Sequence, residues 1–458
     1  MASMDWLEEM HAEFEDEIIH TKSTYVKKMS QDYYWYSPVL KKLLDHHSGD
    51  CVIAPRDEEE LISVLSFAYK RKVPIVSRGG GTGNYGQIVP LYGGIVLDTS
   101  KLNKVLEMKE EQATFQAGCK LGVIEKTLRK HGQELRFYPS TFMKSTLAGF
   151  IAGGTGGIGS IQYGTLWDEG NVLQLSVVTM EEKPRKINVT KKEELTKYIH
   201  SYGISGIITE ATIATAKKTD WHDMIVYFDD LQSALLFSEE VSRKPHIKKR
   251  LVSVCEAPLS SVFKPLRTYR SETKATVLLQ VDPDQTQEVM NLILEHGGET
   301  TDTFAQYVKN HNLRVSDFSW NHVTLWWLKQ NEADTYLQGR FDPHIYLDQV
   351  RQLKACFQDE VLIHFEWIKA RGKLVPSSQP VIRYTTDERL QQIIDAFEKL
   401  GIKVSNPHTY LLEEGGKDDW IDDICIAKKQ NDPCSLLNPG KTKYIAEGIH
   451  EMAGEEHV

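Results

Sequence analysis

The 458-residue chain lacks several features, and each absence excludes a class of protein. No apolar run reaches the roughly 18 residues that a membrane-spanning helix needs. The six cysteines form no C-x-x-C pair, which argues against zinc ribbons, iron–sulfur clusters and a disulfide framework. Basic residues form no long block, and 64 acidic against 54 basic residues give a net charge of −10. Nucleic acids and anionic membranes are therefore not expected partners.

The beginning of the chain also lacks the pattern of a secretory signal, because it is acidic rather than basic. We therefore expect a cytoplasmic protein. A single hydrophobic core stops growing well below this length, so two or three domains are expected.

Glycine is most concentrated at residues 78–86, which read Arg-Gly-Gly-Gly-Thr-Gly-Asn-Tyr-Gly. The last six of these fit the G-x-G-x-x-G pattern, which in a Rossmann unit opens a helix. Pro90 and the glycine pair at 93–94 interrupt the sequence that follows, so no helix is expected there. The pattern favours a loop between strands at 72–77 and 94–98, with backbone amides that hold a phosphate. A plain tight hairpin is the alternative interpretation.

The segments around this loop alternate between strand and helix patterns. A strand at 51–54, a helix at 61–70 and a strand at 73–77 predict a β-α-β unit, which puts the glycine loop at the carboxyl end of a strand, where ligands of α/β sheets bind. The segment 5–47 is expected to be helical. Further strands are expected at 95–98, 104–108, 114–117, 173–180, 203–214, 223–228 and 276–281, helices at 121–131, 229–242, 284–296 and 347–356, and a strand–helix–strand set at 382–404.

A second group of glycine, small and hydroxyl-bearing residues occupies 138–159. Close packing of a helix on a strand is one explanation of such a segment. The other is a second wall of a ligand site. Because neither glycine region has a Walker or Rossmann context, we favour their convergence on one extended ligand.

Short motifs occur along the chain in the order Pro55, Arg78–Gly83, Gly94–Asp98, Gln116–Gly118, Gly149–Gly157, Tyr163–Gly164, Gly206–Ala211 and Leu437–Lys441. Their order and spacing resemble FAD-linked oxidases of the vanillyl-alcohol oxidase superfamily, which have a PCMH-type FAD-binding domain. The glycolate oxidase and D-lactate dehydrogenase flavoprotein branch is the most similar. The resemblance is dense from about residue 50 to 215 and returns near the C-terminus.

This resemblance implies an α+β fold with a two-subdomain FAD-binding domain of the PCMH type and an α+β cap domain for the substrate. The expected division is an N-terminal helical segment at 1–47, the FAD-binding domain at 48–217 and the cap at 218–410. The segment 411–458 is expected to return to the FAD-binding domain.

The resemblance also implies FAD as the cofactor, with its pyrophosphate on the first glycine loop. Relatives with covalent flavin often have a histidine near this loop, and none occurs between residues 51 and 130, so a non-covalent FAD is expected. The residues assigned to FAD are Arg78, Gly79, Gly80, Gly81, Thr82, Gly83, Asn84, Tyr85, Pro139, Ser140, Thr141, Thr146, Gly149, Ala152, Gly153, Gly157, Ile158, Gly203, Ile207, Ile208, Asn438 and Lys441.

For catalysis, the family pattern points to His408, although the carboxylate and glycines that usually surround this histidine are absent. An imidazole can accept the hydroxyl proton of a CH–OH group as hydride leaves for the flavin. A structural histidine with satisfied hydrogen bonds is the alternative.

The resemblance assigns substrate anchoring to Lys329, which it places after a Trp-containing strand, and to Arg340, and it adds Tyr410 to the catalytic group. Ordinary surface ion pairs would explain the two cations equally well. Further residues that could form the pocket wall are Asn321, His322 and Trp326. The metal-binding histidine motif of some relatives is absent, so no metal is expected.

The expected function is therefore an FAD-dependent oxidoreductase that takes hydride from a CH–OH group of a 2-hydroxy acid or a related alcohol. An FAD-binding subunit that oxidises no substrate itself is one alternative, and an oxidase of a larger sugar or aromatic alcohol is another. The sequence leaves the electron acceptor open, and it leaves the oligomeric state open with a homodimer among the alternatives.

Overall fold

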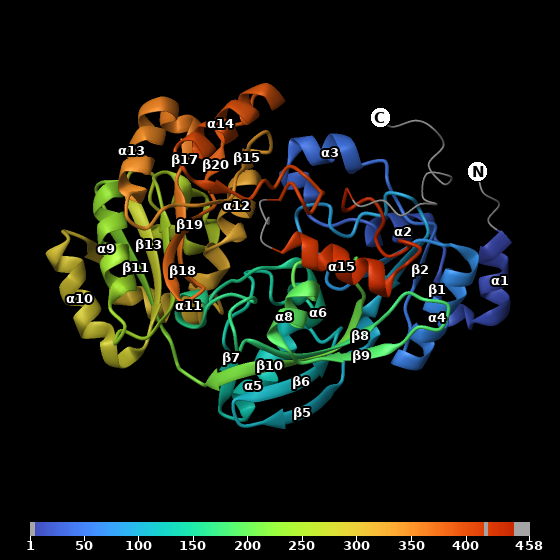
Figure 1. Ribbon diagram of the computed structural model, residues 1–458. Helices are drawn as coiled ribbons and strands as arrows, with labels where there is room; N and C mark the ends of the chain where they lie inside the picture. Colours follow the sequence, from blue (N-terminus) through green and yellow to red (C-terminus); the bar gives the residue numbers. More distant parts are fainter. Residues whose placement is uncertain (1–4, 416–419, 444–458) are drawn as a thin grey trace.

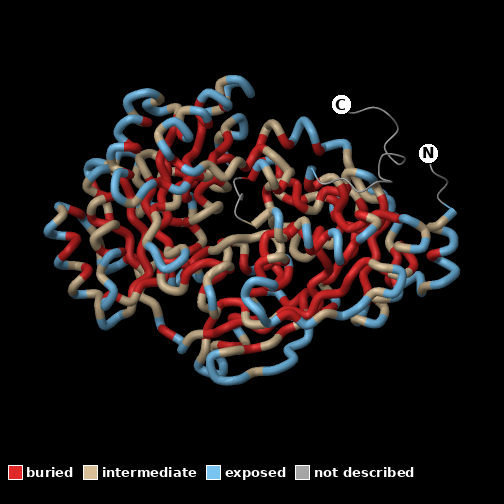
Figure 2. The backbone as a smooth tube through the Cα atoms, viewed as in Figure 1, coloured by how far each residue is buried: buried red, intermediate tan, exposed pale blue. Residues whose placement is uncertain are grey.

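The computed structural model describes residues 5–415 and 420–443 and has two lobes (Figure 1). The first lobe contains the sheets formed by strands up to residue 217, and the second lobe contains those formed from residue 222 onward. Burial follows the sheets of both lobes, while outer helix faces and hairpin ends are exposed (Figure 2). Three short helices come first: α1 (Asp5–Glu13), α2 (Ser23–Met29) and α3 (Pro38–Leu44).

A four-stranded sheet of the first lobe carries the glycine loop. Its order is β1-β2-β4-β3, and its strands are β1 (Ile19–His20), β2 (Cys51–Ile53), β4 (Ile95–Asp98) and β3 (Ile75–Arg78). Helix α4 (Glu58–Arg71) connects β2 to β3 and begins where the Asp57 carboxylate accepts the amide of Glu60 at 2.9 Å. The predicted strand–helix–strand order is correct, but β4 lies between β2 and β3 and pairs with both in parallel.

The second sheet of the first lobe is antiparallel and is organised on one long strand, β10 (Ile207–Lys217). This strand pairs with β6, β7 and β8, because its eleven residues extend beyond each partner. The other members are β5 (Val105–Lys109), β6 (Gln112–Gln116), β7 (Gln133–Leu135), β8 (Val172–Val178) and β9 (Lys186–Val189), and the helices nearby are α5 (Leu121–Lys130), α6 (Leu147–Gly153), α7 (Ser160–Tyr163) and α8 (Lys192–Leu195).

An eight-stranded antiparallel sheet forms the second lobe. Its strands in order are β14 (Glu299–Thr300), β11 (His222–Phe228), β13 (Ala275–Val281), β12 (Lys249–Cys255), β18 (His364–Ala370), β19 (Lys373–Ser378), β16 (Gly339–Arg340) and β21 (Lys403–Val404). A small sheet of β15 (Thr335–Tyr336), β20 (Val381–Ile382) and β17 (Val361–Leu362) lies beside it. The helices of this lobe are α9 (Leu231–Arg243), α10 (Thr286–Glu295), α11 (Thr303–Asn310), α12 (Asn321–Leu328), α13 (Tyr346–Phe357) and α14 (Asp387–Lys399).

Strand pleating assigns the two faces of the large sheet to different cores. Val277 and Leu279 of β13 join an apolar cluster with Phe237 of α9, on the outer face. Leu278, between them in sequence, joins a cluster that also contains Phe115 of the first lobe. Successive side chains of a strand point to opposite faces, so the inner face packs toward the first lobe. One apolar core therefore extends through the junction of the lobes.

The C-terminal segment lies against the first lobe. After helix α15 (Ile421–Asn431), the amide of Asn438 donates to the carbonyl oxygen of Ile75 at 2.7 Å, and that of Ile75 donates to Leu436 at 2.8 Å. This bridge adds the returning chain to the edge strand that leads into the glycine loop.

Most of the predicted elements are confirmed, including the absence of a helix directly after the glycine loop. The sequence patterns did not predict β12, β18, β19, α6 or α12. Within the described ranges, no helix is both long enough and apolar enough to cross a membrane.

Candidate cofactor and substrate site

The glycine loop packs so closely on the 144–149 segment that side chains would not fit. A Cβ atom on Gly79 would collide with the hydroxyl of Thr146, and one on Gly80 would collide with the backbone oxygen of Lys144. Gly81 has a φ of +60°, which a residue with a side chain rarely adopts. Glycine is therefore required here by close approach of two backbones as well as by backbone conformation.

The loop presents donors that have no partner of their own. In the described part of the chain, the amides of Gly79 to Asn84 donate to no other group, although these residues are half-buried or buried. The Nε atom of Arg78 is also buried without a hydrogen-bond partner. Buried donors of this kind normally find an acceptor. The set fits the oxygens of a phosphate or pyrophosphate group.

The donors of residues 78–83 line a cavity of about 70 Å³ between the two glycine regions. Thr146, Gly149, Ala152 and Gly153 form the opposite wall, and Gly203, Ile207 and Ile208 close one end. Its lining combines polar backbone near the loop with apolar side chains at 207–208. This combination suits a ligand that carries phosphate at one place and a flat apolar ring at another.

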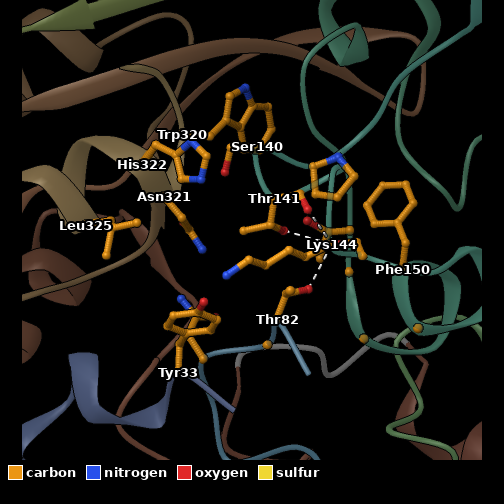
Figure 3. A pocket seen from close by; sticks show the side chains of 18 of the residues that line it. Tyr33, Thr82, Ser140, Thr141, Lys144, Phe150, Trp320, Asn321, His322 and Leu325 are labelled. Atoms are coloured by element: carbon orange, nitrogen blue, oxygen red, sulfur yellow. Dashed lines mark hydrogen bonds between the residues drawn. The ribbon is translucent and has the colours of Figure 1, made fainter. Parts of the chain in front are cut away.

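A larger cavity of about 290 Å³ continues from it, and the two share Thr82, Gly83, Gln87, Gly149 and Gly153 as lining residues. The first lobe contributes Pro139, Ser140, Thr141 and Lys144, and the second lobe contributes Asp317, Trp320, Asn321, His322, Leu325, Gln338 and Gln379. Tyr33 and Tyr36 of the N-terminal segment complete the wall (Figure 3). The larger cavity thus lies between the lobes.

Hydroxyl groups join the two glycine regions at the junction of the cavities. The hydroxyl of Ser145 lies 2.8 Å from that of Thr82 and 2.8 Å from that of Thr141 (Figure 3). The Gln87 side chain donates to the carbonyl oxygen of Gly153 at 2.8 Å. These hydrogen bonds fix the relative position of the two walls.

The second-lobe wall is formed by the start of helix α12. Trp320 precedes the helix with φ 52° and ψ −143°, a strained conformation for a residue with a side chain. Asn321 follows, and its Oδ1 atom is buried without a partner, as is the Oε1 atom of Gln379, a residue only 7% exposed. Burial lowers the pKa of the next residue, His322, below its usual value, so its imidazole is neutral at pH 7.

Most of the residues predicted to bind FAD line one or both cavities. They are Arg78, Gly79, Gly80, Gly81, Thr82, Gly83, Asn84, Tyr85, Pro139, Ser140, Thr141, Thr146, Gly149, Ala152, Gly153, Gly203, Ile207 and Ile208. Gly157 and Ile158 lie behind the wall, where Ile158 exchanges backbone hydrogen bonds with Tyr138. Asn438 donates to the carbonyl oxygen of Gln87 at 2.7 Å, and Lys441 donates to that of Gly86 at 2.7 Å, so both brace the loop from its far side.

The four predicted catalytic residues line neither cavity. His408 is buried, with one ring nitrogen 2.7 Å from the Ser37 hydroxyl and the other 3.0 Å from the carbonyl oxygen of Tyr336. Burial lowers its pKa to about 4, so the imidazole is neutral at pH 7. Both of its ring nitrogens are engaged in structural hydrogen bonds. Tyr410 packs on Leu44, with the Lys441 ammonium 5.0 Å from its ring centre.

The two predicted anchoring cations also lie away from both cavities. Lys329 follows helix α12 rather than a strand, is exposed, and has its ammonium 4.2 Å from the ring centre of Trp326. Arg340 is an exposed residue of β16. The segment 325–328 is helical because Val323, Thr324, Trp327 and Leu328 are buried together, a spacing that only a helix brings to one face.

Of the proposed wall residues, Asn321 and His322 line the larger cavity and Trp326 does not. Sequence reasoning missed Tyr33, Lys144, His200, Gln338 and Gln379. Lys144 could have been found, since it lies between the two segments assigned to the ligand. In the described residues, no group of three or more histidine, cysteine or acidic side chains is arranged to hold a metal ion.

Fold and site define a two-lobed protein with an extended site for a phosphate-bearing cofactor, continuous with a cavity between the lobes. Residues 49–188 of this chain match the family model described as "FAD binding domain". Its cofactor is FAD, and the unpartnered amides, the buried Arg78 Nε and the side-chain-free loop all fit that group.

The relatives cover different shares of the chain. D-lactate dehydrogenase of Archaeoglobus fulgidus is 30% identical over 221 residues, which are 45% of this chain and 49% of that protein. Glycolate oxidase subunit GlcD of Bacillus subtilis is 24% identical over 86% of this chain and 88% of its own length. The solved structure of alkyldihydroxyacetonephosphate synthase has a TM-score of 0.73 at 16% identity, covering 96% of this chain and 85% of that one, and so shares the fold.

Proposed function

We propose that this protein is an FAD-dependent oxidoreductase that removes hydride from the CH–OH carbon of a small 2-hydroxy acid. The single observation that carries the proposal is the continuity of the two cavities: the FAD cradle opens directly into a chamber walled by Trp320, Asn321 and His322. The names of the sequence relatives, which include D-lactate, glycolate and D-2-hydroxyglutarate enzymes, support the substrate class.

FAD, when bound, accepts the hydride. In this proposal the amides of 79–83 and Arg78 hold the pyrophosphate, and Ile207 and Ile208 contact the adenine. The hydroxyls of Ser140 and Thr141 and the glycines of the second region line the part of the site that faces the second lobe.

His322 replaces His408 as the proposed base. Its imidazole lines the chamber on the second-lobe wall (Figure 3), and a hydrogen bond to the Asp317 backbone engages one ring nitrogen, which leaves the other to accept a proton. Because burial lowers its pKa, the neutral form that can accept a proton from the substrate hydroxyl prevails at pH 7. His408, by contrast, has both nitrogens engaged away from the chamber.

In this proposal, residues 48–217 bind FAD and residues 218–410 bind the substrate. The helical segment 1–47 and the returning segment 411–458 flank these two parts. The large sheet and its outer helices form a lobe of their own (Figure 1), and this lobe contributes Trp320, Asn321 and His322 to the chamber, which supports this division. The segment 416–419 and residues 444–458 lie outside the described residues.

The test begins with the purified protein, which should be yellow and release free FAD on denaturation. Anaerobic addition of glycolate, D-lactate and D-2-hydroxyglutarate should bleach the flavin, whereas polyols and aromatic alcohols should not. Bleaching only by the latter would favour the oxidase of larger alcohols. Stable flavin that no donor reduces would favour the FAD-binding subunit instead. Reoxidation by oxygen or a quinone, the mass in solution and cell fractionation would then test the acceptor, a homodimer and the cytoplasmic location.

A further inference from the structure

The chamber between the lobes contains a cation that the proposed function does not use. Lys144 is an exposed residue of the first-lobe wall, and its side chain reaches into the chamber, toward the wall that carries Asn321 (Figure 3). Its backbone is fixed, because its amide donates to the carbonyl oxygen of Thr141 at 2.9 Å. Its own carbonyl oxygen packs so closely on Gly80 that a Cβ atom there would collide with it. The close packing of the two glycine regions thus aims this side chain.

In the described part of the chain, Lys144 makes no ion pair and no side-chain hydrogen bond. Its positive charge is therefore not neutralised by an acidic side chain. The one carboxylate among the described lining residues is Asp317, and it is committed to Arg314: one oxygen lies 3.3 Å from the guanidinium and the other accepts the Arg314 amide at 3.1 Å. The remaining polar lining is hydroxyl, amide and imidazole. The chamber therefore has one uncompensated positive charge.

Two lining residues of the chamber each have a buried side-chain oxygen without a donor. Oδ1 of Asn321 and Oε1 of Gln379 are buried and unpartnered, and both residues line the chamber. A buried acceptor without a donor is costly, so such atoms indicate a ligand that brings hydrogen. A cation and polar side chains in the lining of one cavity match a molecule with an anionic end and a neighbouring hydroxyl.

We propose that Lys144 is the residue that binds the carboxylate of the substrate, while the substrate hydroxyl donates its one hydrogen to His322. This deepens the proposed function and rests on it. The anionic end is thereby recognised from the FAD-binding lobe and not by Lys329 or Arg340, which line neither cavity. The chemical class selected is a 2-hydroxy carboxylate over a diol with the same carbon skeleton.

The test uses oxalate, a carboxylate that carries no oxidisable CH–OH group, titrated into the FAD-loaded protein and followed by the flavin absorbance. Loss of one charge-assisted contact should weaken oxalate binding about tenfold or more in Lys144→Met, and less in Lys144→Arg. Lys329→Met and Arg340→Met are the matched controls, since they remove exposed cations, and they should bind oxalate as the parent does. Flavin content shows that each variant is folded.

The visible absorbance spectrum of the bound flavin and the FAD affinity, both measured without oxalate, are the reference readouts. They should be unchanged in Lys144→Met; a change as large as that for oxalate would mean that Lys144 acts on the flavin and would overturn the proposal. Failure of the parent to bind oxalate, or equal binding by Lys144→Met, would overturn it as well. If no hydroxy acid bleaches the parent but oxalate binding still requires Lys144, the proposed function fails and the anion site stands.

Discussion

The carboxylate of Glu366 accepts the backbone amide of Trp320 at 2.6 Å. This hydrogen bond crosses from β18 to the residue that begins the chamber wall, and it holds Trp320 in its strained conformation. Glu366 also accepts from the Ser253 hydroxyl at 2.8 Å and lies 3.0 Å from the imidazole of His364, with all three side chains buried. A buried polar cluster behind the wall thus positions the residues that face the substrate.

Replacing Glu366 by alanine should lower the free energy of unfolding by about 3 kcal/mol, because the change removes one member of a buried, hydrogen-bonded cluster. It should also weaken binding of a 2-hydroxy acid, since Trp320 to His322 lose their support. Urea denaturation and the substrate dependence of flavin bleaching measure the two effects. Glu272→Ala, at an exposed position of the same lobe, should change stability by about 0.5 kcal/mol or less. Equal behaviour of the two variants would contradict the assignment.

The buried His408 predicts a specific loss of stability in acid. Its pKa is about 4 in the folded protein and about 6.5 in an unfolded chain, so only the unfolded chain takes up the proton between these values. The stabilising difference is present above pH 6.5 and is lost as the pH falls toward 4, by about 3 kcal/mol in total. Urea unfolding at several pH values should show a shallower dependence for His408→Gln than for the parent.

The same variant separates a structural from a catalytic role. His408→Gln should retain most of the rate of flavin reduction once folded, and His131→Gln, at an exposed position, should keep the parental pH dependence of stability. A fall in the reduction rate of His408→Gln by a factor on the order of a hundred would restore His408 as the base.

The proposed base predicts a pH profile for catalysis. His322 must be neutral to accept a proton, and burial lowers its pKa, so the rate of flavin reduction should rise with pH and reach its plateau with a midpoint below 6.5. In anaerobic stopped-flow experiments, His322→Gln should be slower by a factor on the order of a hundred or more and lose this transition. A variant that retains both the rate and the transition would exclude His322.

Gly80→Ala should release FAD without unfolding the protein. The new methyl group would meet the backbone oxygen of Lys144, and a backbone cannot move aside as a flexible side chain can. A displacement that costs about 1.4 kcal/mol of binding energy weakens affinity about tenfold, and a larger one is expected here. Fluorescence titration of the apoprotein with FAD measures the effect. Gly132→Ala places a methyl group at a φ of +72°, where it meets no atom within 4 Å, and because Gly132 lines neither cavity this variant should bind FAD normally.

The FAD site could be predicted from the sequence because its determinants are local. Glycines that admit a close backbone approach are visible as a run of residues, whatever the rest of the chain does. The substrate wall could not be predicted in this way. Tyr33, Lys144 and Gln379 meet only in the folded protein, and no periodic pattern relates them. The apolar run that ends at Lys329 fits a strand or a helix equally well, and only tertiary burial decides between the two.

The last prediction concerns the contact that joins the lobes. Arg250 of β12 crosses into the first lobe, where its guanidinium donates to the carbonyl oxygen of Leu135 at 3.0 Å and lies 3.6 Å from the buried carboxylate of Glu134. It also lies over the ring of Tyr138, 4.6 Å from the ring centre, directly before the chamber wall at Pro139. The lobes are thus joined by a buried charge next to the cavity.

Arg250→Met retains the apolar stem but leaves the Glu134 carboxylate short of one cation, which should lower the free energy of unfolding by about 3 kcal/mol. The substrate concentration for half-maximal bleaching should rise as well, because the wall at 138–139 loses its contact with the second lobe. Arg243→Met, which removes an exposed pair with Glu239, should cost about 1 kcal/mol or less. If both variants unfold at the same urea concentration, the junction does not depend on Arg250, and the apolar core shared by the lobes must hold them together alone.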